Sequence, residues 1–213
     1  MPLVKTAAII LKSRKWGEAD RIVTFYSKEF GKIRGVARGA RRFKSRFGAT
    51  LEPFTRCHLD LFEKPGDSLY RISHVDLIES FQPLREELVL MSCAARMVNI
   101  VGAVTPDGDP DFRLFETLGQ GLRSLKDSRD PVLTALLFQI RLLGLTGFRP
   151  QTDQCATCGK TCVTGDLQFS PLAGGVVCLS CAMRQMVRCV GMSRGSLSHG
   201  GHRSSTHPVR RCR

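Results

Sequence analysis

Four cysteines near the C-terminal end of this 213-residue chain are spaced in two matched pairs. Cys155 and Cys158 form one Cys-x-x-Cys pair, and Cys178 and Cys181 form another after 19 intervening residues. Two such pairs can close a tetrahedral thiolate cage around Zn²⁺, each on a tight turn whose backbone amides stabilise the sulfurs. The spacing therefore predicts one structural zinc ion bound by these four residues.

The residues around the cysteines are typical of a zinc ribbon. Gly159 relaxes the first turn, and residues 167–170 and 176–177 are predicted to be short strands joined by a turn that contains two glycines. Cys162 is a fifth thiol within reach, so the spacing leaves open which four thiols bind the metal.

Thiol-redox chemistry at Cys155 or Cys178 is the competing interpretation. A thioredoxin-type motif needs one reactive pair at a helix start in a βαβ setting, and two matched pairs in a glycine-rich loop fit that poorly. A catalytic zinc is disfavoured because four thiolates leave no open coordination position. Cys57 and Cys93 fall in strand and helix patterns, where we expect them to be small buried hydrophobic residues.

A second group of residues that could bind a ligand lies between Gly31 and Leu51. This segment is rich in basic residues and contains no acidic residue. Phe43 and Phe47 lie among the basic residues of this segment. Cations that contact phosphates beside rings that stack on bases are typical of a single-strand nucleic-acid groove. The alternative is a solvated loop with two buried phenylalanines. The predicted DNA-binding residues are Arg34, Arg38, Arg41, Arg42, Phe43, Lys44 and Arg46.

The overall charge also favours a polyanionic partner. The chain has 32 Lys and Arg against 19 Asp and Glu, a net charge of +13. Residues 1–80 contain 16 basic and 9 acidic residues, and the last 32 residues contain 7 basic and no acidic ones. Nucleic acid or an acidic protein segment is the expected partner, with a basic proteome background as the alternative explanation.

The basic segment lies within a region that alternates like β structure. We expect five strands at residues 6–11, 21–26, 32–37, 57–62 and 69–77. Five short strands suit a small closed barrel. An OB-fold is the commonest choice, and an SH3-like barrel fits the strand count too.

Helical periodicity follows the strands. We expect helices at residues 84–101, 111–126 and 130–145, with Leu84, Leu88 and Met91 on the inward face of the first. Asp130 and Pro131 are a plausible N-cap and first helical residue. The predicted fold is therefore α+β with two domains: an OB-fold barrel at residues 1–80, and a helical domain at residues 81–182 that carries the zinc module at residues 151–182.

Several blocks of this sequence together resemble the RecO recombination-mediator family. The blocks are residues 6–11 (TAAIIL), 17–21 (GEADR), 29–33 (EFGKI), 37–41 (ARGAR), 51–54 (LEPF) and the two cysteine pairs with Gly159, Gly174 and Gly175. Their order and spacing agree with the family over about residues 4–182. The resemblance implies an OB-fold, a helical domain with a zinc site, binding to single- and double-stranded DNA, annealing of complementary strands, and partnership with RecR and single-stranded-DNA-binding protein.

The segment after the zinc module departs from the family, which continues with further helices. Residues 183–213 are rich in Arg, Ser, Gly and His and have no helical period, so we expect a disordered or aberrant basic tail. Loss of those helices would uncover apolar surface on the remaining ones.

The leading functional hypothesis is a DNA-binding and strand-annealing mediator that is not an enzyme. No phosphate-binding glycine loop, nucleophile elbow or paired carboxylates indicate turnover chemistry. No apolar run approaches the roughly 20 residues that span a bilayer, so we expect a cytoplasmic, nucleoid-associated bacterial protein. The alternatives are a barrel and zinc-ribbon protein that binds RNA or acts in transcription, and, less favoured, a thiol-redox enzyme.

Overall fold

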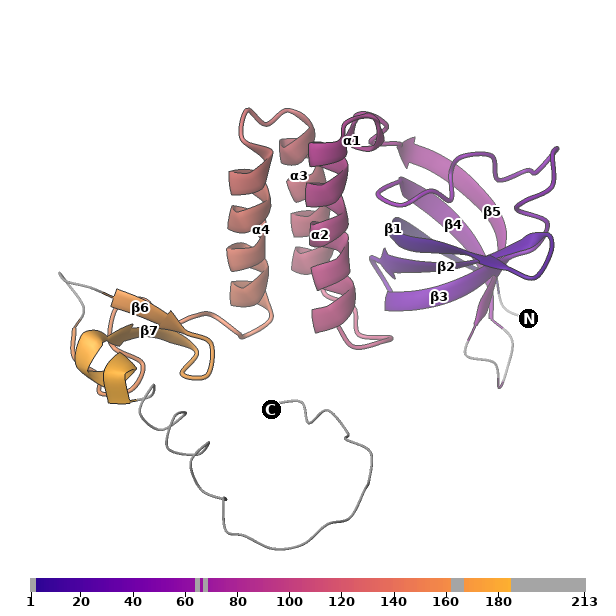
Figure 1. Cartoon of the computed structure of the whole chain (residues 1–213). Coiled ribbons are helices and arrows are strands. Elements are labelled where there is room, and N and C mark those ends of the chain that lie inside the picture. The colour runs from indigo at the N-terminus through magenta and orange to yellow at the C-terminus, as the bar shows by residue number, and fades with distance from the viewer. Residues whose placement is uncertain (1–2, 64–65, 67–68, 162–166, 185–213) are drawn as a thin grey trace, which may run out of the picture. The chain divides into compact units, whose positions relative to one another are not determined.

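The chain forms two compact units in a computed structural model, which describes residues 3–63, 66, 69–161 and 167–184 (Figure 1). The first unit, Met1–Arg149, contains a β-barrel and four helices, and the second, Pro150–Arg213, contains the cysteine module. No helix among the described residues is long and apolar enough to cross a membrane.

The N-terminal part of the first unit is a closed five-stranded barrel with the order β1-β2-β3-β5-β4. Strands β3 and β5 pair in parallel, and the other neighbours are antiparallel. The strands are β1 (Leu3–Trp16), β2 (Asp20–Ser27), β3 (Gly31–Ala37), β4 (Arg56–Phe62) and β5 (Tyr70–Glu79). The prediction of five N-terminal strands is confirmed, although β1 extends well beyond the predicted residues 6–11.

Strand β1 contributes to two hydrophobic cores. Ala8 and Ile10 belong to the core inside the barrel, whereas Ile9 and Leu11 pack in the core that the barrel shares with the helices. The register with β2 shifts between Ile10 and Lys12. Such a bulge adds one residue and redirects the side chains that follow it.

A second irregularity overturns part of the predicted alternation in β5. Strict alternation over residues 69–77 would place Ile72 and His74 on one face, but the buried residues are Ile72 and Val75. Asp60 pairs with His74 while Leu61 pairs with Ile72, so Ser73 is an extra residue in β5. One inserted residue moves every later side chain to the opposite face of the strand.

The helices follow the barrel in the first unit, with α4 on the far side of α2 and α3 (Figure 1). They are α1 (Pro83–Glu86), α2 (Leu88–Val104), α3 (Phe112–Lys126) and α4 (Pro131–Leu145). Asp111 and Asp130 cap α3 and α4 by accepting hydrogen bonds from backbone N–H groups of the first turn. The predicted cap at Asp130 is confirmed.

The single helix predicted over residues 84–101 is wrong, because the chain is extended at Glu87 (φ −114°, ψ 127°). The break changes the helical phase, so Leu88 and Met91 are exposed instead of buried. The buried face of α2 consists of Leu90, Cys93, Ala94, Met97, Val98 and Val101.

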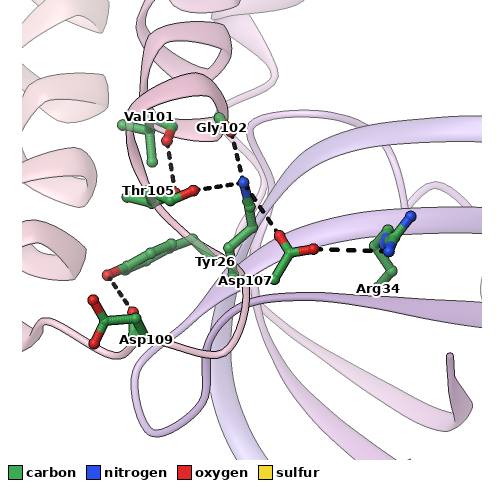
Figure 2. A network of polar contacts seen from close by, with 8 residues as sticks. Tyr26, Arg34, Val101, Gly102, Thr105, Asp107 and Asp109 are labelled. Atoms are coloured by element: carbon green, nitrogen blue, oxygen red, sulfur yellow. Dashed lines mark hydrogen bonds and ion pairs between the residues drawn. The ribbon is translucent and has the colours of Figure 1, made fainter. Parts of the chain in front are cut away.

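The segment between α2 and α3 attaches the helices to the barrel. The ammonium group of Lys32 in β3 donates hydrogen bonds to the carbonyl oxygens of Gly102 (2.8 Å) and Thr105 (2.6 Å) at the end of α2. The Tyr26 hydroxyl in β2 accepts a hydrogen bond from the Asp111 N–H (3.0 Å) and donates a longer one to the Asp109 carbonyl (3.4 Å; Figure 2). These bonds and the shared core make the barrel and helices one unit.

Helix α4 is apolar on both sides. Ala135, Phe138 and Leu142 face the core. The outward side also carries apolar residues, which are exposed in the described part of the chain: Val132, Leu133, Leu136, Leu137 and Ile140.

The second unit contains a two-stranded antiparallel sheet of β6 (Leu167–Ser170) and β7 (Gly175–Cys178), followed by a helical turn at residues 179–184. The strands predicted at residues 167–170 and 176–177 are confirmed. Most of the predicted tail, residues 185–213, lies outside the described residues, and so does Cys162.

Candidate nucleic-acid interface and metal centre

The four predicted metal ligands lie together in the second unit. The Sγ atoms of Cys155, Cys158, Cys178 and Cys181 are all within 4.8 Å of one another. Those of Cys158 and Cys178 are 3.8 Å apart. In a tetrahedral site with Zn–S bonds of about 2.3 Å the sulfurs are about 3.8 Å apart, so the thiols fit zinc. They are the one cluster of at least three potential metal ligands in the described ranges.

The first cysteine pair lies on a turn closed by its own backbone. The Cys155 N–H donates to the Lys160 carbonyl (2.8 Å), and the Gly159 N–H donates to the Cys155 carbonyl (2.8 Å). Gly159 has a φ of +73°, which glycine adopts without steric cost. The second pair connects the end of β7 to the turn at residues 179–184. Each cysteine pair therefore lies on a local backbone turn that orients its two thiols.

The thiols perturb one another in a way that a cation would relieve. The Cys178 N–H donates to the Cys155 Sγ (3.4 Å), and this hydrogen bond is the main reason why the pKa of Cys155 is lowered to about 6. A hydrogen bond from the Ser180 hydroxyl lowers the pKa of Cys178. The interaction with Cys178, followed by burial, raises the pKa of Cys181 to about 12. The last thiol resists ionisation beside existing thiolates, and a bound divalent cation removes that penalty.

The predicted basic segment is divided between β3 and the loop of residues 38–55 that joins β3 to β4. Arg34 is an exposed residue of β3, and its Nη2 lies 3.7 Å from the Asp107 Oδ2. The remaining predicted residues are all exposed on the loop: Arg38, Arg41, Arg42, Phe43, Lys44 and Arg46.

The start of this loop is fixed to the β1–β2 turn. The Gly39 N–H donates to the Asp20 carboxylate (2.8 Å), and the Arg41 N–H donates to the Ala19 carbonyl (2.9 Å). The Arg41 guanidinium also donates to the carbonyls of Gly17 (3.1 Å) and Glu18 (2.9 Å). Arg41 therefore has a structural role, because it holds the start of the loop against the β1–β2 turn at the end of the barrel.

The two phenylalanines of the segment have different environments. Phe47 is 2% exposed and belongs to the core inside the barrel, whereas the side chain of Phe43 is fully exposed. Arg46 lies over the Phe47 ring at 4.9 Å from its centroid. Of the two stacking candidates, Phe43 alone presents a free ring to a ligand.

Comparison with known proteins identifies the family. The family model for the recombination protein O N terminal matches residues 1–81, and the model for the recombination protein O C terminal matches residues 85–190. The chain belongs to the RecO family. A "DNA repair protein RecO" from Alkaliphilus metalliredigens is 36% identical over 180 residues, which cover 84% of this chain and 72% of that relative.

Other RecO relatives match a similar part of the chain. The protein of the same name from Thermoanaerobacter sp. is 34% identical over 182 residues, covering 85% of this chain and 72% of the relative. The one from Syntrophobacter fumaroxidans is 39% identical over 161 residues, covering 76% of this chain and 64% of the relative. These matches confirm the resemblance inferred from the sequence blocks.

In this RecO family member the basic loop continues onto a barrel face that the sequence analysis missed. Lys12, Arg14 and Trp16 are exposed at alternate positions of β1, so they lie on one face of the strand. Lys12 pairs with Thr24 of β2, and Thr24 pairs with Arg34 of β3. The alternation of Lys12, Arg14 and Trp16 was readable in the sequence. It was missed because the predicted strand ended with the apolar run at Leu11.

Proposed function

We propose that this RecO family protein binds DNA on the outer face of β1, β2 and β3 and on the adjoining loop of residues 38–55. It would act in DNA repair as a recombination mediator without turnover chemistry. The observation that carries the proposal is the cross-strand row of Lys12, Thr24 and Arg34, which continues through Arg38 into the basic loop. Cations on one continuous face contact successive phosphates along a strand.

The charges on this face are available to a ligand. Among the described residues, no ion pair engages Lys12, Arg14 or Arg38. The Asp20 carboxylate at the end of the face accepts a hydrogen bond from the Gly39 N–H instead. Backbone phosphates therefore meet little competition from acidic side chains along most of the face.

The barrel supports the same assignment, and we infer that it is an OB-fold. Five strands close in the order β1-β2-β3-β5-β4, with β3 and β5 parallel. OB-folds bind oligonucleotides on the face that includes β2 and β3 and on the loop between β1 and β2. In this protein the basic face and the fixed β1–β2 turn occupy those positions.

Two exposed aromatic residues supply stacking surfaces at the same end of the barrel. Trp16 is 55% exposed at the end of β1, next to the turn that holds Arg41, and Phe43 lies two residues after Arg41. Tryptophan is highly buried on average in folded proteins, so this exposed indole offers an unusually open surface for stacking. Base stacking on such rings tolerates any sequence, as a mediator requires.

The cysteine module is proposed to hold one structural Zn²⁺ through Cys155, Cys158, Cys178 and Cys181. Four thiolates would occupy all four coordination positions of the zinc ion and leave none for a reactive water. Zinc would supply folding free energy to a unit whose hydrophobic core, within its described residues, is small: the buried residues grouped there are Cys155, Val177, Cys181 and Ala182.

Annealing follows from the same basic face. Cations that neutralise phosphates reduce the repulsion between complementary strands that approach one another. The family resemblance adds RecR and single-stranded-DNA-binding protein as proposed partners, and assistance in loading the recombinase as the biological role.

The test is fluorescence anisotropy with labelled single-stranded DNA, duplex DNA and RNA of the same sequence, combined with fluorescence-monitored annealing of complementary oligonucleotides. We expect binding to both DNA forms, accelerated annealing, and loss of both as salt rises. Trp16 is the single tryptophan of the chain, so its fluorescence should be quenched by unlabelled single-stranded DNA. A clear preference for RNA would favour the RNA-binding alternative, and no binding to either would contradict the proposal.

A further inference from the structure

A cavity of about 310 Å³ opens where the outer face of the barrel meets α2. Three basic side chains line it, those of Lys12, Lys32 and Arg34. Asp107, from the segment after α2, is the one acidic residue among its lining residues. The hydroxyl of Thr24 and the amide of Asn99 add further polar groups, so hydrogen-bond donors outnumber the acidic acceptors.

The strand register brings two of these cations to the same place. Lys12, Thr24 and Arg34 are direct cross-strand partners on β1, β2 and β3. Direct partners on one face have Cβ atoms about 4.5–5.5 Å apart, so two long side chains flanking Thr24 can converge on one small anion. The bulge in β1 makes this possible, because Leu11 and Lys12 both line the cavity although they are consecutive.

Lys32 has no free capacity for a ligand. Its side chain is 16% exposed, and its ammonium group has three acceptors: the Gly102 carbonyl (2.8 Å), the Thr105 carbonyl (2.6 Å) and the Asp107 Oδ1 (3.2 Å). An ammonium group has three N–H donors, so all of them are used. Lys32 therefore holds the end of α2 and fixes the Asp107 carboxylate at the edge of the cavity.

Arg34 is held only loosely by comparison. Its side chain is 50% exposed, and its Nη2 lies 3.7 Å from the Asp107 Oδ2, beyond hydrogen-bonding distance. The Asp107 carboxylate is directed toward Arg34 through one oxygen (Figure 2) and toward the Lys32 ammonium group through the other. The N–H groups of the Arg34 guanidinium are therefore available to a stronger acceptor, although the Asp107 carboxylate partly offsets its charge.

We propose that this cavity binds a backbone phosphate of a nucleic-acid strand through Lys12 and Arg34, and that Asp107 is a built-in competitor for Arg34. The proposal rests on the proposed function, because it places one contact of the DNA track at the α2 end of the β1–β2–β3 face. A bound phosphate accepts bidentate hydrogen bonds from the guanidinium, which Asp107 at its present distance does not. Asp107 limits the affinity of the site and disfavours weakly charged ligands.

The experiment measures the salt dependence of single-stranded DNA binding by the full chain and five variants: Lys12→Gln, Arg34→Gln, Asp107→Asn, the Arg34→Gln, Asp107→Asn double variant, and Lys5→Gln. Lys5 is the matched control, a cation of β1 that lies 3.6 Å from Asp60 of β4 and outside the cavity. Thermal unfolding of each variant verifies that it is folded.

We expect Lys12→Gln and Arg34→Gln each to flatten the log–log salt slope by about 0.7, the value for one phosphate contact on a single strand. Asp107→Asn should strengthen binding by about two- to fivefold, as expected for a partly exposed charge pair. That gain should disappear in the Arg34→Gln background, because the competitor acts through Arg34. Lys5→Gln should match the wild type.

The outcomes separate this proposal from the proposed function. Lys12→Gln and Arg34→Gln could keep the wild-type salt slope while neutralising the basic loop still abolishes DNA binding. That result would overturn the phosphate site in the cavity and leave the proposed DNA-binding function standing. Absence of DNA binding by the wild type would overturn both. A ³¹P NMR titration with inorganic phosphate completes the test: saturable binding of free phosphate that DNA does not displace would mean that the cavity serves a free anion instead of a strand.

Discussion

The Sγ atoms of Cys158 and Cys178 lie 3.8 Å apart although 19 residues separate the two cysteines in sequence. Pairing of β6 with β7 shortens that separation, and the Ala156 N–H donates to the Val176 carbonyl (2.8 Å), which holds the first cysteine turn against β7. Backbone hydrogen bonds therefore bring the two pairs together, and four thiols in one place are expected to bind a metal ion.

We predict one zinc ion per chain, held by the four cysteines. Cys178→Ser should lower the zinc content and loosen the second unit, because structural zinc contributes directly to folding free energy. Acidification should also release the metal, since protons compete for the thiolates. Elemental analysis and amide exchange across residues 151–182 measure these effects. Cys93→Ala is the control and should keep its zinc, and full occupancy in a Cys155→Ser, Cys178→Ser double variant would show that other residues bind it.

Phe43 and Phe47 provide a matched pair for separating binding from stability. Phe47→Ala removes a ring from the barrel core and should lower the free energy of unfolding by about 3–5 kcal/mol. Phe43→Ala should leave stability nearly unchanged and weaken single-stranded DNA binding by about 1–3 kcal/mol without altering the salt slope. Urea unfolding and anisotropy titrations distinguish the two. Unchanged affinity in a folded Phe43→Ala variant would exclude Phe43 as a stacking residue.

Gly31 tests the connection between the barrel and the segment after α2. A Cβ added at this residue would lie 2.2 Å from the Asp109 carbonyl oxygen, and its φ is +65°. Gly31→Ala should therefore lower the free energy of unfolding by about 2–4 kcal/mol, through steric clash added to backbone strain. Gly17→Ala is the control, with φ +55° and no atom within 4 Å, and should cost only about 1 kcal/mol. Equal effects in urea unfolding would mean that the segment is not closely packed on Gly31.

Local patterns were enough to predict the cysteine module and most of the barrel. The cluster of four cysteines follows from the spacing of two motifs, and the alternation of Leu59 and Leu61 predicts the buried face of β4, where both residues are fully buried. The burial of Cys57 and Cys93 was also predicted correctly. In each case one short segment contains the whole signal.

The features that were missed depend on single-residue irregularities. Periodicity through residues 84–101 continues across Glu87, and only the folded chain shows that the helix breaks there and changes phase. The bulges in β1 and β5 likewise depend on pairing with other strands. The first of these bulges places Lys12 opposite Thr24, in one cross-strand row with Arg34, so the site missed most completely is the one that three separate strands assemble.

The central claim is that the basic loop and barrel face contact DNA phosphates, and the salt dependence of single-stranded DNA binding tests it most directly. Four to six contacts predict a log–log slope of about −3 to −4 for the wild type. Neutralising Arg38, Arg42 and Lys44 together should flatten this slope by about 2 and weaken binding to all sequences alike, because phosphates carry no base identity. Arg41 is left intact because it holds the β1–β2 turn. Neutralising Arg113, Lys126 and Arg129 on and beside α3 removes the same charge and should leave the slope unchanged. A folded Arg38, Arg42, Lys44 variant with wild-type affinity and slope would contradict the account.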